Sequence, residues 1–291
     1  MEKKHILARY IFKMRKRYLL LLMSGLNLIT WGQTINAPVN THLCTILGDF
    51  SYPQRHELKG GEKDSLKISS NKKGLYIIPP LVTDSTVLWQ KKIVTVYFLD
   101  DDRFIKDKVL KIANLWSEHS GIRFVKTLNQ SASDIRVSFR SNGWASCIGT
   151  EALRVSKRLP TLSLDSIYLY PTETFQSVIL HEFGHALGLL HEHQHPFIQI
   201  NWNLPNLYKY YKETYCWDSA AVKANIIDKY KSATAIYCEP DKESIMIYAI
   251  PLCIDDKSCL TDDNLFIPQP IELSPLDKLN IHYLYNNIDC H

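Results

Sequence analysis

Residues 181–196 of the chain read HEFGHALGLLHEHQHP, and the arrangement of the remaining sequence is best understood from this stretch. His181 and His185 stand four residues apart in an apolar run, a spacing that places both imidazoles on one face of an α-helix. Zn²⁺ accepts histidine nitrogens at about 2.0–2.1 Å, and a catalytic zinc site has three protein ligands and one open position. The spacing therefore predicts a helix that supplies two of three zinc ligands.

The third nitrogen must come from outside this helix face. Gly188 permits that geometry, because glycine adopts positive φ at little cost, so the helix can end there and His191 can turn back towards the metal. We therefore predict that one Zn²⁺ is bound by three imidazoles, those of His181, His185 and His191. Glu182 follows the first histidine directly, which places its carboxylate beside the open position and predicts a general base. A chance pair of histidines on a surface helix is the alternative for HExxH alone.

A second motif, SIMIY at residues 244–248, lies about fifty-five residues downstream. The string HExxHxxGxxH is the signature of the metzincin zinc peptidases, which also carry a methionine-containing turn beneath the metal. The pattern Ser-x-Met-x-Tyr resembles the Met-turn of one metzincin branch, the astacins, and so does Glu192 after the third histidine. The resemblance implies that Met246 forms an apolar floor under the zinc. It also implies that Tyr248 is a displaceable fifth ligand whose hydroxyl stabilises the oxyanion; without the histidines, both would be ordinary core residues.

The resemblance covers roughly residues 90–288 and implies an α+β fold. This is a metzincin-like, two-lobed domain with a twisted mixed sheet, an active-site helix and zinc in the cleft. The C-terminal lobe is expected to be mostly irregular or helical and to contain the Met-turn. The sequence departs from the family at His195, where arginine is usual, and His193 and His195 are predicted to be loop histidines rather than ligands.

Local patterns agree with that fold. Residues 92–99 are rich in β-branched and aromatic side chains and predict a strand, and apolar residues then recur at helical spacing over 105–116. Further strands are predicted at 122–126 and 135–140. The resemblance to astacins implies that residues 161–164 form an edge strand facing the cleft, where an extended peptide could add by main-chain hydrogen bonds.

The N-terminal third divides into two expected segments. Residues 1–37 hold a basic start and a short apolar stretch, which predicts a signal peptide; a retained signal anchor is the alternative. Residues 38–85 are loop-rich and occupy the place of a propeptide. Within them, residues 46–50 resemble the astacin zymogen motif, which implies that Asp49 reaches the zinc, while a turn capped by Asp49 is the alternative. The catalytic domain is then expected over residues 86–291.

Charge and cysteine content narrow the class of protein. Seven basic residues against one acidic residue in 1–37 account for more than the whole net charge of +4, and the remainder carries −2, so no nucleic-acid partner is expected. Seven cysteines suit an exported protein. Local bridges are plausible for Cys253–Cys259 and Cys216–Cys238, and the resemblance implies that Cys290 pairs with Cys44 or Cys147. A free, buried Cys147 stays open, and the odd count leaves at least one thiol unpaired or shared between chains.

The sequence as a whole therefore predicts a secreted, zinc-dependent endopeptidase that acts on a protein or peptide substrate. Two alternatives stay open: a catalytically silent zinc-containing binding module, and a membrane-tethered peptidase that keeps its leader. The intact Glu182 argues against the first alternative, because a silent module has no need of a base. Membrane association is expected only if the leader is retained, and no sequence pattern predicts the oligomeric state.

Overall fold

The computed structural model describes residues 44–46, 83–101, 103–141, 143–230, 235–236, 240–255 and 258–286. The described residues belong to one compact unit, Asn40–His291. The expected leader (1–37), most of the expected propeptide (38–85) and its Asp49 lie outside the described residues. None of the described helices combines the length and the apolar character that a bilayer span requires.

The structure has the two expected lobes, and the first of them is built on a six-stranded mixed sheet. Its strand order is β1-β6-β7-β5-β3-β4, and every neighbouring pair is parallel except β6 with β7. The strands are β1 (Cys44–Ile46), β3 (Ile93–Phe98), β4 (Arg123–Lys126), β5 (Ile135–Ser138), β6 (Trp144–Ser146) and β7 (Leu162–Leu164). The three strands predicted at 92–99, 122–126 and 135–140 are confirmed. A separate two-stranded pair joins β2 (Thr83–Asp84) to β8 (Ala235–Ile236).

The predicted edge strand is in the wrong place. Strand β7 pairs with β5 on one side and with β6 on the other, so residues 161–164 lie inside the sheet. All three β7 residues are buried, as expected for a strand covered on both faces. The outermost strand from residues 86–291 at this end is β6, and β1 pairs with it in parallel.

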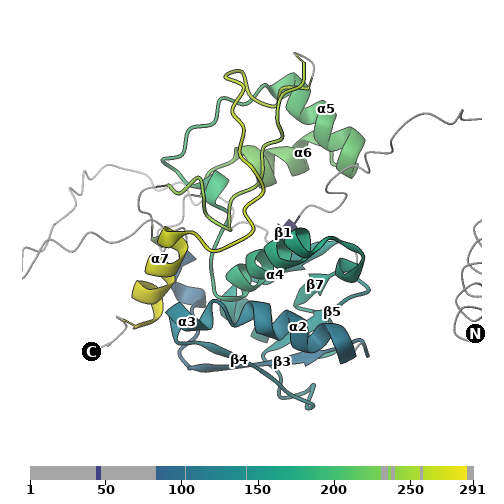
Figure 1. Ribbon diagram of the computed structural model, residues 1–291, viewed down its shortest axis with the longest axis vertical. Coiled ribbons are helices and arrows are strands. Elements are labelled where there is room, and N and C mark those ends of the chain that lie inside the picture. The colour runs from purple at the N-terminus through teal and green to yellow at the C-terminus, as the bar shows by residue number, and fades with distance from the viewer. Residues whose placement is uncertain are drawn as a thin grey trace, which may run out of the picture. The chain divides into compact units, whose positions relative to one another are not determined.

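Two helices pack against each other and against the sheet (Figure 1). They are α2 (Arg103–Ala113) and α4 (Thr172–Ala186). Trp116, just before the short α3 (Ser117–Ser120), is fully buried and donates its indole N–H to Leu180 O in α4 at 2.9 Å. Helix α3 ends at Gly121, whose φ is 69°, and it lies beside the last helix. That helix is α7 (Pro275–Asn286).

The second lobe contains few regular elements, as expected. In Figure 1, α4 lies between the labelled strands β3, β4, β5 and β7 and the helices α5 (Leu204–Tyr215) and α6 (Ser219–Val222). A π-helical turn, η5 (Lys223–Ile227), continues α6. Short 3₁₀ turns occur elsewhere in the described chain: η1 (Ser85–Val87), η2 (Gly149–Leu153), η3 (Ile167–Leu169) and η4 (Glu192–Gln194).

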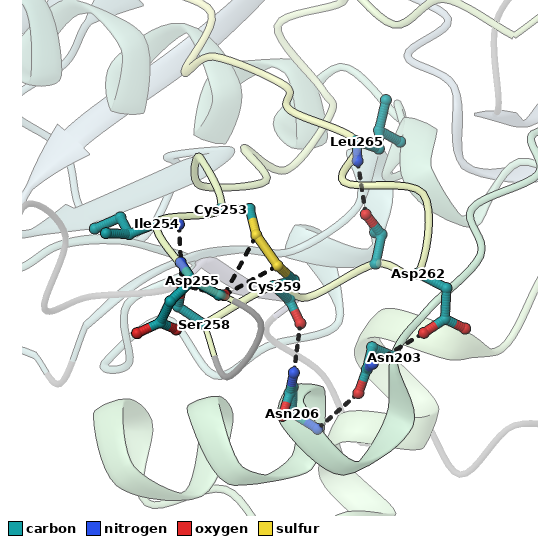
Figure 2. The surroundings of a disulfide bond; sticks show 10 residues. Asn203, Asn206, Cys253, Ile254, Asp255, Ser258, Cys259, Asp262 and Leu265 are labelled. Carbon is teal, nitrogen blue, oxygen red and sulfur yellow. Dashed lines mark hydrogen bonds between the residues drawn. A yellow bond between two sulfur atoms is a disulfide. The ribbon is translucent and has the colours of Figure 1, made fainter.

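The disulfide predicted between Cys253 and Cys259 is present and closes a six-residue separation (Figure 2). Cys259 O accepts a hydrogen bond from Asn206 Nδ2 at 3.0 Å, which ties this loop to the first turn of α5. The predicted bridge from Cys216 to Cys238 is wrong, because Cys216 is an exposed free thiol. Cys147 is buried and free, which confirms the alternative left open for it and excludes it as the partner of Cys290. A pairing of Cys290 with Cys44 stays a prediction.

Candidate metal centre

Helix α4 presents His181 and His185 together near its C-terminal end. Their rings lie 4.8 Å apart, centroid to centroid, and both are buried. His181 Nδ1 is 2.7 Å from Ile245 O, and His185 Nδ1 is 2.7 Å from Leu189 O. Because a carbonyl oxygen only accepts, each Nδ1 carries the proton and each Nε2 is left with a free lone pair.

The chain reverses at Gly188 and brings the third histidine to the first two. Helix α4 ends at Ala186, and Gly188 adopts a φ of 99°, which a residue with a side chain rarely takes. Leu189 N then donates to Gly184 O at 3.1 Å, closing the helix end. His191 follows with its Nε2 3.0 Å from His185 Nε2.

The three imidazoles make a donor set that fits a zinc ion. Their candidate ligand atoms all lie within 4.8 Å of one another. A separation of 3.0 Å between His185 Nε2 and His191 Nε2 requires a shared proton or a shared cation between them. His181 Nε2 is buried and has no hydrogen-bond partner within the described ranges, so a cation is the group that uses all three lone pairs.

Burial keeps these rings neutral. Desolvation lowers the pKa of His181 to about 4 and holds the pKa values of His185 and His191 well below 6.5. The neighbouring imidazoles lower the pKa of His185 and His191 further, because two charged rings would repel each other. Neutral imidazole is the form that binds a metal, so the site is ready for one at pH 7.

Of the other two predicted site residues, Glu182 is the next residue after a ligand on α4, and Tyr248 packs against the histidine rings. Glu182 is 1 % exposed and follows His181 on α4. Tyr248 is 8 % exposed, with its ring centroid 4.5 Å from that of His191 and 6.1 Å from that of His181. The two residues are 66 positions apart in the sequence, and the fold brings both to the histidine cluster.

Met246 packs against α4 where the helix has no side chain. A Cβ on Gly184 would overlap Met246 Sδ and would lie 3.2 Å from Trp116. Met246 is fully buried in the core of the first lobe, together with Ile245, whereas Ile247 and Tyr248 belong to the core of the second lobe. The turn at 244–248 therefore joins the two cores directly at the metal site.

A buried carboxylate holds this turn. Asp277 accepts hydrogen bonds from Ser244 Oγ at 2.7 Å and Ile245 N at 2.8 Å, and Ile245 O in turn contacts His181. Asp277 also forms a reciprocal cap with Ser274 at the start of α7. Burial raises the pKa of Asp277 to about 6, against its hydrogen bonds, which lower it. The cap was predictable from the spacing, whereas the contact with the turn spans 32 residues and has no local signal.

Sequence reasoning also missed the environment of the segment after the third ligand. His193 and His195 are both buried and lie outside the metal-binding group, as predicted. His193, however, stacks on Tyr248, with the ring centroids 4.3 Å apart and the planes at 27°. Glu192 N donates to Met246 O at 3.0 Å, which links the third ligand's segment to the Met246 turn.

A family model described as Astacin, a family of peptidases, matches residues 81–285, a range that includes every residue of this site. The chain belongs to the astacin family. Astacins are zinc metallopeptidases with one catalytic zinc, so this chain is by family a zinc metalloendopeptidase, and its histidine cluster fits that metal. The predicted family and fold class are thereby confirmed.

Individual relatives agree with the assignment. This astacin is 29 % identical over 110 residues to "Zinc metalloproteinase nas-19" of Caenorhabditis elegans; the match covers 37 % of this chain and spans only 26 % of that protein. A structure of myroilysin superposes with a TM-score of 0.63 at 29 % identity and covers 70 % of this chain and 98 % of that one. A second structure, a crystal structure of myroilysin, gives 0.51 at 30 % identity over 69 % and 86 % of the two chains. As an astacin, the chain is expected to take protein or peptide substrates.

Proposed function

We propose that this astacin is a secreted endopeptidase in which His181, His185 and His191 hold the catalytic zinc. The proposal rests mainly on one observation. Three neutral imidazoles lie together beside the buried Glu182 in a chain of this family. When bound, zinc supplies a Lewis acid that polarises the scissile carbonyl and makes water more acidic. The rest of the chemistry is assigned to side chains of this protein.

Glu182 is the proposed proton carrier. Its carboxylate follows the first ligand on a rigid helix, and it would take a proton from the attacking water and deliver it to the leaving amine. Positioned general acid–base catalysis contributes roughly 10²–10⁴-fold to rate. Tyr248 is the proposed donor to the oxyanion, because its ring packs on that of the third histidine and its phenol can donate a hydrogen bond.

The edge of the sheet supports a peptide substrate. Strand β6 is the outermost strand from residues 86–291 at its end, and its outer edge can pair with an extended main chain whatever the side chains are. In this structure the edge pairs with β1, three residues of the expected propeptide. We therefore propose that residues 38–85 are removed on activation, and that their departure frees β6 for substrate.

The test of the activity is casein hydrolysis by the processed protein. Glu182→Gln should lower kcat by roughly 10³-fold or more while the protein keeps about one zinc per chain. Glu173→Gln, at an exposed position on the same helix, is the matched control and should match the wild type. A Glu182→Gln protein that holds zinc and keeps activity within about tenfold of the wild type would exclude this mechanism. A silent binding module would show no hydrolysis in any variant.

The test of processing is N-terminal sequencing of the protein after export. The expected mature N-terminus lies at about residue 86, so that β1 has been removed with the rest of residues 38–85. An exported, active protein that still contains residues 44–46 would contradict the propeptide assignment, and one that still contains residues 1–37 would support the membrane-tethered alternative.

A further inference from the structure

The ring of Tyr248 is held on one side by a residue that is not among the metal-binding histidines. His193 is 1 % exposed, and its imidazole stacks on the phenol ring with centroids 4.3 Å apart and planes at 27°. The contact with the third ligand, His191, is less parallel, at 4.5 Å and 58°. Of the three histidine rings beside Tyr248, those of His181, His191 and His193, the ring of His193 is the most nearly parallel to the phenol ring, and it limits the directions in which that ring can tilt.

His193 is itself fixed by the second lobe. Its Nε2 lies 2.9 Å from Asn225 O, so Nε2 carries the proton and donates it to that carbonyl. Its other nitrogen, Nδ1, is buried and has no hydrogen-bond partner among the described residues, so Asn225 sets the rotation of the ring. Lys229 Nζ donates to His193 O at 2.7 Å and fixes the main chain of the same residue.

The carbonyl of Asn225 is available because the helix changes its hydrogen-bonding pattern there. Asp228 N donates to Lys223 O at 2.8 Å, an i to i+5 bond, in the π-helical turn η5. That turn directs two carbonyls to the segment after the third ligand: Ala224 O accepts from Gln194 Nε2 at 2.8 Å, and Asn225 O accepts from His193. Single π-helical turns are frequent at functional sites, where they reposition such groups.

We propose that His193 is a positioning residue for Tyr248, oriented by the π-helical turn η5. The inference rests on the proposed function, in which the Tyr248 hydroxyl stabilises the oxyanion. An oxyanion donor must lie about 2.7–3.1 Å from the developing charge, and a misplacement of about 1 Å can cost on the order of 10² in rate. A ring held from one side by His193 has its hydroxyl placed before substrate arrives.

A double-mutant cycle tests this role. His193→Ala removes the stacking partner, and we expect kcat to fall by about tenfold with KM changed by less than about twofold and with zinc content unchanged. His193→Phe keeps an aromatic ring but loses the bond to Asn225 O, so a smaller fall in kcat, about threefold, is expected. In the Tyr248→Phe background, where no hydroxyl needs to be placed, both changes should alter kcat by less than about twofold.

Gln194→Met is the matched control. It breaks the bonds that Gln194 Nε2 donates to Ala224 O and Asp228 O and the bond that Gln194 Oε1 accepts from Tyr230, but it removes no ring from Tyr248. If a variant acts only by making the segment after His191 less rigid, it should change kcat equally in the wild-type and Tyr248→Phe backgrounds. This is the result expected for Gln194→Met. If His193→Ala also gives equal effects in the two backgrounds, or if it releases zinc, the positioning role is wrong.

The cycle separates this inference from the function on which it rests. If Tyr248→Phe alone leaves kcat unchanged, the oxyanion role of Tyr248 fails, whatever His193 does. If Glu182→Gln also stays active, the proposed mechanism fails. A strong Tyr248→Phe effect together with a silent His193→Ala overturns only the positioning role.

Discussion

The imidazoles of His181 and His185 each donate Nδ1–H to a main-chain carbonyl, and these bonds determine which nitrogen faces the cluster. One of the two carbonyls, that of Leu189, comes from the same turn as the ligand, and the spacing of the histidines is local. For this reason the ligand set could be predicted from sequence. The other carbonyl, that of Ile245, is 64 residues away, so the partner of His181 could not.

Tyr248 gives the first prediction at this scale. Tyr248→Phe keeps the ring and its packing but removes the phenol donor, so kcat should fall by about 10²–10³-fold while KM changes little. Steady-state kinetics on a fluorogenic peptide measure both constants. An unchanged kcat, or a rise in KM that accounts for the whole loss, would show that the hydroxyl does not act in the transition state.

Asp277 gives the second prediction at the scale of single residues. Asp277→Ala leaves Ile245 N and the Ser244 hydroxyl buried without their acceptor, and each such group costs about 1–3 kcal/mol. We expect the free energy of unfolding in urea to fall by about 3 kcal/mol or more. The exposed Asp101→Ala serves as the control and should change it by less than about 0.5 kcal/mol. A fall below about 1 kcal/mol would mean that water replaces the lost acceptor.

Helix α4 and the Met246 turn pack closely against each other, and each needs a particular residue at the contact. Gly184 allows Met246 to lie directly on the helix, one residue before His185. The HExxH pattern alone leaves this position open to any side chain. The need for glycine arises from a contact 62 residues away, which no periodicity in the sequence shows.

Gly184→Ala is therefore expected to destabilise the protein. Alanine favours a helix by about 1 kcal/mol relative to glycine, but the new Cβ overlaps Met246 and forces overpacking, so a net loss of about 1–3 kcal/mol is expected. Thermal unfolding measures it, with Glu173→Ala on the exposed side of the helix as control. Combining Gly184→Ala with Met246→Ala should cost less than the sum of the single changes, and a stabilised Gly184→Ala protein would refute the contact.

At the scale of the molecule, the strands and helices of the first lobe were largely predictable, because their apolar periodicity is local. The strand order was not. Leu162 and Leu164 are buried in the middle of the sheet, and their neighbours on both sides are set by long-range pairing. The cysteines show the same difference between local and long-range features. The short Cys253–Cys259 bridge was predictable from the sequence, whereas whether Cys147 and Cys216 are free or bridged depends on the fold.

The pH dependence of the metal-free protein follows from burial. The folded-state pKa of His181, about 4, lies below its unfolded value of 6.5. The unfolded chain therefore takes up a proton first as the pH falls, so this group removes stability between about pH 6.5 and pH 4. Glu192 acts with the opposite sign, because burial raises its pKa to about 8 and its protonated form is favoured in the folded state.

The contribution of His181 to the pH dependence of stability is measured by comparing the wild type with a variant that lacks this ring. Between pH 7 and pH 5, wild-type protein in a chelator should lose about 2 kcal/mol of unfolding free energy more than His181→Asn does, because the variant lacks the titrating ring and shares every other group. Urea unfolding at the two pH values gives the comparison. Equal losses in both proteins would show that the ring is not buried in the metal-free state.

The turn at residues 244–248 constrains how this peptidase can move. Its first apolar pair, Ile245 and Met246, is anchored in one lobe, and its second, Ile247 and Tyr248, in the other. A displacement of this turn would pull a side chain out of one of the two cores, so we expect any relative movement of the two lobes to leave the turn in place. Such a movement would pivot beside His181, whose imidazole is bonded to the Ile245 carbonyl of the same turn, and would leave that bond intact.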